Sequence, residues 1–270
     1  MRAWLLAAAL LTLGVAGCGG SGTGGALAQS SGGCGRMSSL IPGEWVEQTL
    51  DVDGVARVYV VRLPEGYNAS RPYPVVYQFH GCSNSLEADN PPLENEAGAD
   101  AILVRARAVD ICWVLGGDSP DVAFFDALVA AIEGSLCADQ ARRFVSGYSR
   151  GAYLSHTLAC VRADRIRAVA TIAGGSAGSG CGGPVAALLV HDRDDGAVNI
   201  SESEGVRDQL AERNHCALDQ ARQSIAPAPC EAYVGCDQGY PVVWCETSGQ
   251  GHDRQDAFVV PAFWDFFTRF

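Results

Sequence analysis

The stretch RFVSGYSRGAYLSHTLAC, residues 143 to 160, indicates the architecture of the whole chain. An apolar run suited to a buried strand leads into Gly147-Tyr148-Ser149-Arg150-Gly151, and the residues from Ala152 onward have the pattern of a helix. A serine on so sharp a strand-to-helix turn must project its hydroxyl, and glycines two positions away let the backbones pass closely. A GxSxG motif can arise by chance in a chain with 32 glycines, but the context on both sides favours Ser149 as a nucleophile.

Apolar runs on either side of this turn predict a mainly parallel α/β sheet. An antiparallel pair is expected first, and buried strands then alternate with amphipathic or apolar helices. Such an alternation gives a single sheet covered on both faces, with ligands beyond the carboxyl ends of the strands. The expected strands are residues 45–52, 57–63, 74–79, 111–115, 143–146, 166–172, 185–190 and 242–245, and the expected helices are 121–136, 152–160 and 257–267, with patchy helical periodicity over 91–109.

The order of polar residues after Ser149 is that of an α/β hydrolase, in which an acid and then a histidine follow the nucleophile. His252 stands in a glycine-flanked loop after the last strand, so it is the expected base, whereas His156 and His215 are expected to be structural and surface residues. Three carboxylates follow the strand that ends near His191, and spacing alone leaves the acid open among Asp192, Asp194 and Asp195.

The oxyanion hole is expected to use two backbone amides. One is that of Arg150, the residue after the nucleophile, and the other lies in the loop after His80 and Gly81, with Cys82 as its expected carrier. His80 itself is expected to brace this loop rather than to transfer protons.

Composition restricts the partners and the compartment. The net charge is -12, with 19 basic against 31 acidic residues, which argues against a nucleic-acid partner. Eleven cysteines are too many for a reducing cytoplasm, and none has zinc-site spacing, so we expect disulfides and no metal.

The first 33 residues have the pattern of an export segment. Residues 1–17 form a positive start and a short apolar run that ends in Val15-Ala16-Gly17-Cys18, which resembles the lipobox of bacterial lipoproteins. That resemblance implies a signal peptide over 1–17, lipidation of Cys18, a flexible tether over 18–33 and a domain over 34–270 at the cell surface. Cleavage after Ala28 would instead release the protein outside the cell.

Motifs along the domain resemble carbohydrate esterase family one. The chain is most similar to the fungal-type feruloyl esterases of that family and more distantly to polyhydroxybutyrate depolymerases. The resemblance extends over nearly all of residues 34–270, and the residues that carry it include Arg62-Leu63-Pro64, Tyr67, His80-Gly81, Asp121-Val122, Phe124, Leu136-Cys137, the serine motif, Leu158-Ala159-Cys160, His191, Asp195, Asn199-Ile200-Ser201 and Gly239-Tyr240-Pro241.

This resemblance selects one of the three carboxylates as the acid. The family's HGxxD pattern implies that Asp195 is the acid, although Asp192 stands where the family has glycine. Arg150 replaces an aromatic or polar residue, and it could favour an acidic substrate or pair with Asp192 or Asp194. Six cysteines fall at family positions, and Cys82 with Cys112 and Cys230 with Cys245 are hypothetical additional pairs.

The sequence therefore predicts a monomeric serine esterase of the α/β-hydrolase fold that needs no cofactor. Its expected substrates are feruloyl or acetyl esters on plant cell-wall polysaccharide such as xylan, cleaved through an acyl-enzyme. Depolymerisation of polyhydroxyalkanoate is an alternative, which an exposed apolar patch would favour. An inactive binding lipoprotein is a third possibility, against which the intact order of serine, acid and histidine weighs.

Overall fold

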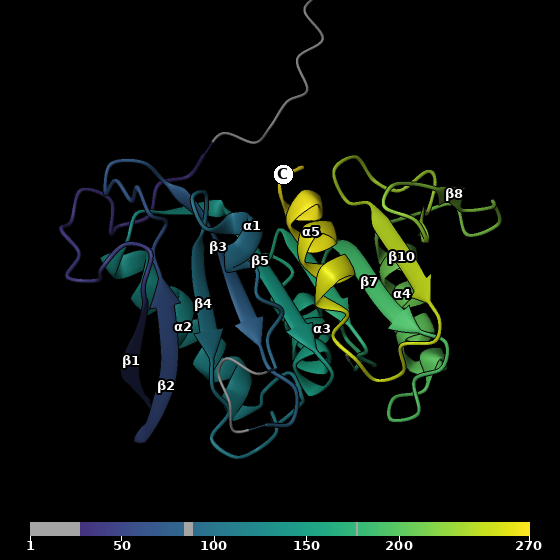
Figure 1. Cartoon of the computed structure of the whole chain (residues 1–270), viewed down its shortest axis with the longest axis horizontal. Coiled ribbons are helices and arrows are strands. Elements are labelled where there is room, and N and C mark those ends of the chain that lie inside the picture. The colour runs from purple at the N-terminus through teal and green to yellow at the C-terminus, as the bar shows by residue number, and fades with distance from the viewer. Residues whose placement is uncertain (1–27, 84–88, 177) are drawn as a thin grey trace, which may run out of the picture.

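One ten-stranded sheet runs through the whole protein (Figure 1). The computed structural model describes residues 28–83, 89–176 and 178–270, so the expected signal peptide, Cys18 and most of the tether lie outside the described residues. The strand order is β1-β2-β4-β3-β5-β6-β7-β10-β9-β8. The strands are β1 (Trp45–Val52), β2 (Val55–Arg62), β3 (Tyr73–Phe79), β4 (Ile102–Ala106), β5 (Ala138–Tyr148), β6 (Ala168–Ile172), β7 (Ala186–Asp192), β8 (Gln223–Ser224), β9 (Cys230–Ala232) and β10 (Val242–Thr247).

The central six strands, β4, β3, β5, β6, β7 and β10, are parallel, and antiparallel strands flank them on both sides. Every residue of β3, β4, β6 and β7 is buried, as expected for parallel strands covered on both faces. The mainly parallel sheet predicted from the sequence is confirmed.

Helices cover both faces of the sheet. The helices are α1 (Glu94–Ala97), α2 (Pro120–Ser135), α3 (Arg150–Val161), α4 (Ile200–Arg213) and α5 (Asp256–Phe267). Apolar side chains of α2, α3 and α4 belong to one core cluster, and those of α1 and α5 belong to a second cluster on the opposite face. Figure 1 shows α5 in front of the sheet with α3 and α4 behind it. Among the described residues, no helix is long and apolar enough to cross a membrane.

Local sequence explains where the longest helix begins. The Ser119 hydroxyl accepts a hydrogen bond from the Val122 amide, and Pro120 occupies the first helical position, where a missing N–H costs nothing. Phe124, Phe125 and Leu128 on its inner face are completely buried. The helix expected over residues 121–136 is therefore confirmed within one residue at each end.

One predicted strand is wrong. Residues 111–115 form an irregular segment, and the fourth strand is instead Ile102–Ala106, inside the region with patchy helical periodicity. The apolar character of 111–115 has another cause, because Trp113 is buried against His80 and its indole donates to the His80 carbonyl at 2.8 Å. A short apolar run fits a buried loop anchor as well as a strand.

The flexible tether expected over residues 18–33 is wrong for residues 29–33. Ser30 forms a β-bridge with Asp139, and the Gln29 amide donates to the Asp139 carboxylate at 2.9 Å. Ser31 is buried, and its hydroxyl donates to the carbonyl of Leu136 at 2.7 Å. Residues 29–33 thus pack against the domain.

Five disulfides stabilise the domain. The two hypothetical pairs, Cys82–Cys112 and Cys230–Cys245, are both confirmed. The other six cysteines pair as Cys34–Cys137, Cys160–Cys181 and Cys216–Cys236. This cysteine usage is that of a protein from an oxidising compartment.

Candidate active site

Ser149 lies on a strained turn between β5 and α3. Its φ is 52° and its ψ is -122°, a conformation that side-chain-bearing residues rarely adopt. The two flanking glycines make this turn possible. A Cβ on Gly151 would lie 1.9 Å from the carbonyl oxygen of Phe79, and one on Gly147 would lie 2.3 Å from the Gly151 backbone. The strand, the turn and the helix can therefore meet only without side chains at these two positions.

The fold brings Ser149, His252 and Asp195 together from three separate loops. The Ser149 hydroxyl is 2.9 Å from His252 Nε2, and His252 Nδ1 is 2.7 Å from Asp195 Oδ2. With an ionised Asp195, Nδ1 carries the proton and donates, so Nε2 is free to accept from the serine. This arrangement can remove the hydroxyl proton as the oxygen attacks an electrophile.

Asp195 is held in its ionised form within the site. Its side chain is fully buried, and Oδ1 accepts hydrogen bonds from the amides of Ala197 and Val198 at 2.8 and 2.9 Å. Burial acts to raise the pKa of Asp195, but hydrogen bonds from His252 and these two amides outweigh it, so the pKa lies below its ordinary value. A buried carboxylate of this kind can orient an imidazole and stabilise its charged form.

His191, which precedes these carboxylates, supports the acid and does not approach the serine. Its ring is buried, with Nε2 3.0 Å from the Val198 carbonyl and 3.5 Å from Asp195 Oδ2. Burial lowers the pKa of His191. The other two downstream histidines behave as expected, since His156 is buried between α3 and β6 and His215 is exposed.

Two backbone amides near the serine are available to an oxyanion. Among the described residues, the amides of Arg150 and Cys82 donate to no protein acceptor. Gly81, the neighbour of Cys82, lies close to the nucleophile, because a Cβ placed on it would be 3.4 Å from Ser149 Cβ. His80 braces this loop as expected, with Nε2 accepting from the Ala108 amide at 3.1 Å and Nδ1 donating to the Gly81 carbonyl.

Arg150 does not pair with either of the carboxylates suggested by the sequence. Its Nε donates to the Trp113 carbonyl at 3.0 Å, and it forms no ion pair with any described carboxylate. Asp192 and Asp194 instead accept hydrogen bonds from loop amides. The side chain after the nucleophile is thus anchored to the irregular segment that replaced the predicted strand.

The sequence analysis missed Tyr148, which supports the histidine. Its hydroxyl donates to the His252 carbonyl at 3.0 Å, and the two rings lie 5.2 Å apart. Burial is the main cause that raises the pKa of Tyr148 to about 12, so it is a neutral donor at physiological pH. Its position inside the serine motif was the available signal, but its partner lies 104 residues away.

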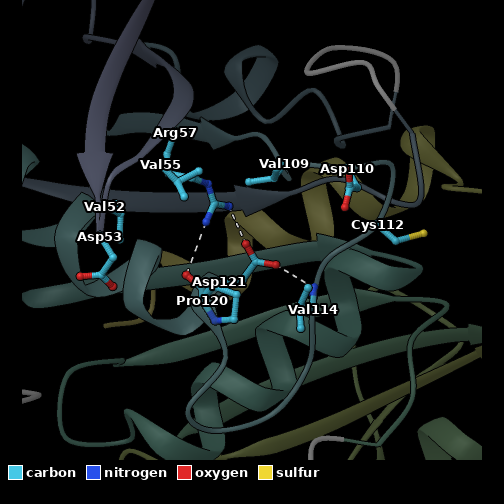
Figure 2. Close-up of a pocket in the computed structure, with 10 residues that line it drawn as sticks. All are labelled: Val52, Asp53, Val55, Arg57, Val109, Asp110, Cys112, Val114, Pro120 and Asp121. Carbon is cyan, nitrogen blue, oxygen red and sulfur yellow. Dashed lines mark hydrogen bonds and ion pairs between the residues drawn. The ribbon is translucent and has the colours of Figure 1, made fainter.

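A separate cavity of about 300 Å³ lies beside the β1–β2 hairpin (Figure 2). Arg57 and Asp121 lie in its wall and form a buried ion pair at 2.5 Å, while Asp121 also accepts from the Val114 amide at 2.7 Å. Cys112 lines the cavity and is bonded to Cys82, so the cavity neighbours the candidate active site without including Ser149, Asp195 or His252. Val55, Val109 and Val114 in its lining are about half exposed.

Within the described parts of the chain, no group of three His, Cys, Asp or Glu side chains could hold a metal ion.

Solved structures define the class of fold. An acetyl xylan esterase from Aspergillus awamori superposes with a TM-score of 0.62 at 16% identity, over 83% of this chain and 100% of that chain. A CE1 ferulic acid esterase from Anaeromyces mucronatus superposes with a TM-score of 0.56 at 19% identity, over 83% and 89% of the two chains. The protein therefore has the α/β-hydrolase fold of esterases.

Curated sequences define the family. Feruloyl esterase D of Neurospora crassa is 33% identical over 275 residues, which span 91% of this chain and 92% of that protein. Feruloyl esterase C of Emericella nidulans is 31% identical, over 88% and 91% of the two chains. No protein-family model matches the chain. The chain belongs to the feruloyl esterase family and is a carboxylic ester hydrolase, as the resemblance implied.

Proposed function

We propose that the protein hydrolyses feruloyl or acetyl esters on plant cell-wall polysaccharides such as xylan through an acyl-enzyme formed on Ser149. The observation that carries this proposal is the chain of contacts from Ser149 through His252 to Asp195, at 2.9 and 2.7 Å. The similarity to proteins named feruloyl esterase supports the substrate class. The proposed enzyme is a monomer, and its acyl-enzyme route uses protein groups alone, without metal or cofactor.

In the proposed acylation step, Ser149 Oγ attacks the ester carbonyl while its proton passes to His252 Nε2. The carbonyl oxygen becomes an oxyanion that accepts hydrogen bonds from the amides of Arg150 and Cys82. Collapse of this intermediate breaks the bond to the alcohol, which leaves with the proton from His252. Asp195 keeps the His252 ring in the required tautomer and stabilises its positive charge.

Deacylation repeats the sequence with water in place of the serine. His252 takes a proton from the water, whose oxygen attacks the acyl carbonyl, and the same amides hold the second oxyanion. The bond to Ser149 Oγ then breaks, the serine regains its proton from His252, and the carboxylic acid leaves.

The proposal is tested with methyl ferulate and p-nitrophenyl acetate as parallel substrates. We expect turnover of both, and Ser149→Ala should lower kcat by at least about 10⁴-fold because the covalent route is lost. Thermal unfolding of the variant should match that of the wild type, which separates loss of chemistry from loss of fold. Turnover of acetate alone would restrict the substrate to small acyl groups, and activity that survives Ser149→Ala would contradict the proposal.

Depolymerisation of a polyhydroxyalkanoate is a second candidate, favoured by one observation. Val55, Val109, Ile111 and Val114 are each about half exposed, and three of them line the cavity beside the Cys82–Cys112 disulfide. Exposed apolar groups close to an active site suit adsorption to a polyester surface. Release of hydroxybutyrate from polymer films, reduced by Val109→Ser with Val114→Ser but with unchanged p-nitrophenyl acetate turnover, would support this candidate over the first.

We further propose export and a lipid anchor at Cys18, with 1–17 removed as a signal peptide. The lipobox sequence and the five disulfides support export. Mass spectrometry of the mature N-terminus tests the anchor. A diacylated Cys18 is the expected result. A mature N-terminus at Gln29 would instead show that the protein is cleaved after Ala28 and released without a lipid anchor. Labelling of Ser149 by a fluorophosphonate would exclude an inactive binding lipoprotein.

A further inference from the structure

Asp192 is a buried carboxylate outside the group of residues that the mechanism uses. It is the last residue of β7, and its register partner is Thr247, the last residue of β10. The residue is only 1% exposed. Burial of a charged group is unfavourable unless the group is fully hydrogen-bonded, so the hydrogen-bond partners of Asp192 decide whether it can stay charged.

Four donors surround this carboxylate: three backbone amides from two different loops and one hydroxyl from the end of β10. From the loop that carries Asp195, the Asp194 amide donates to Oδ1 at 2.9 Å. From the loop that carries His252, Gly251 donates to Oδ1 at 3.1 Å and Gln250 to Oδ2 at 3.1 Å. The Thr247 hydroxyl donates to Oδ2 at 3.0 Å. Both oxygens are thus satisfied, with each loop held to the same side chain.

The position of these bonds links them to the candidate triad. Gly251 directly precedes His252, and Asp194 directly precedes Asp195. The Asp192 carboxylate therefore lies between the two backbone segments whose side chains meet at 2.7 Å. Gly249 and Gly251, which precede His252, have φ angles of 78° and 66°, a backbone conformation that favours glycine, and the His252 side chain itself is 24% exposed.

We propose that Asp192 is a positioning residue that holds the His252 loop against the Asp195 loop and so sets the geometry of the triad. This inference rests on the proposed function, because it concerns the same nucleophile and base. The pKa of Asp192 supports it. Burial acts to raise this pKa, but the amides and the hydroxyl outweigh that effect and lower it, so the carboxylate stays ionised at working pH.

The test compares Asp192→Asn with Asp139→Asn. An Asn at 192 keeps one acceptor oxygen and turns an NH₂ group toward two donors, so half of the bonds are lost. Asp139 is the matched control, because it is also a carboxylate with 1% exposure that accepts from backbone amides, those of Gln29 and Ala141, and it has no contact with either loop of the candidate triad among the described residues. With p-nitrophenyl acetate we expect Asp192→Asn to lower kcat by about 10- to 100-fold with KM within about two-fold, because a misplaced base costs chemistry rather than binding. Asp139→Asn should change kcat by less than about three-fold.

A double-variant cycle separates positioning from stability. If Asp192 acts through His252, Asp192→Asn should have no further effect on kcat in a His252→Ala background. An equal loss in both backgrounds, or a lowered Tm with unchanged kcat, would overturn the proposal. If Asp192→Asn fails to fold, Thr247→Val carries the test, with an expected several-fold loss of kcat that disappears without His252; no loss would overturn it.

Failure of the proposed function is distinguishable from failure of this inference. A wild-type protein that neither turns over p-nitrophenyl acetate nor reacts with a fluorophosphonate would refute the function itself. A wild-type enzyme whose kcat survives Asp192→Asn would refute only the positioning role.

Discussion

The conformation of Ser149 depends on neighbours without side chains. Because a Cβ on Gly151 would lie 1.9 Å from the Phe79 carbonyl oxygen, Gly151→Ala must push α3 away from β3. We expect a loss of more than about 3 kcal/mol in the free energy of unfolding. We also expect kcat to fall by about 100-fold, because the nucleophile moves relative to its base. Urea unfolding and p-nitrophenyl acetate turnover measure the two effects.

Gly205→Ala is the control for the Gly151→Ala variant. It lies inside α4, and a Cβ there would meet no atom within 4 Å. Gly205→Ala should therefore stabilise the protein by about 0.5 to 1 kcal/mol, because alanine loses less backbone entropy in a helix, with no change in activity. If the two alanine variants were equally stable, the close approach of α3 and β3 would not be what requires Gly151.

At the scale of elements, His156 joins α3 to the strand beside it. Its Nδ1 donates to the Gly175 carbonyl at 2.7 Å, and its Nε2 accepts from the Thr171 hydroxyl of β6 at 2.8 Å. The ring is completely enclosed, and burial lowers the pKa of His156 from 6.5 to about 4. The helix that follows Ser149 is thus fixed by a neutral histidine.

This neutral histidine predicts how stability depends on pH. Below pH 6.5 the unfolded chain binds a proton at His156, whereas the folded protein binds it only near pH 4. The unfolded state holds more protons between these values, so the free energy of unfolding falls as the pH falls, by about 3 kcal/mol in total for this group. Urea unfolding at pH 7 and pH 4 should show this loss in the wild type. In His156→Gln, the drop in the free energy of unfolding between these two pH values should be smaller by about 3 kcal/mol. His80 and His191 titrate in both proteins and cancel in the comparison. Parallel pH curves for the two proteins would refute the assignment.

At the scale of the whole molecule, the disulfides differ in the length of chain that they close. Cys34–Cys137 spans 103 residues, whereas Cys216–Cys236 spans 20. In the chain-entropy account, replacing the first pair by alanine should cost about 4.7 kcal/mol and replacing the second about 3 kcal/mol. Denaturant unfolding of the two double variants measures the difference. Equal losses would show that local packing, rather than loop closure, determines the contribution of each bond.

The sequence predicted the elements that depend on local pattern. The β1–β2 pair, α2 and the turn at Ser149 follow from apolar periodicity, Pro120 and two glycines, each of which acts within a few residues. The strand at Ile102–Ala106 was missed, because a run of only five residues that includes Arg105 can be read in several ways without its neighbours. The resemblance to known esterases supplied Asp195, which spacing alone left open.

The sequence by itself determined the class of chemistry, because a serine between glycines at a strand end, followed by an acid and a histidine, permits few alternatives. Only the tertiary structure decided which atoms meet. His252 stands 103 residues from Ser149 and 57 from Asp195, and parallel strands bring the three loops to one edge of the sheet. The role proposed for Asp192 and the partner of Arg150 were likewise inaccessible to sequence, because a hydrogen bond between distant loops depends on the packing of the whole domain and leaves no local pattern.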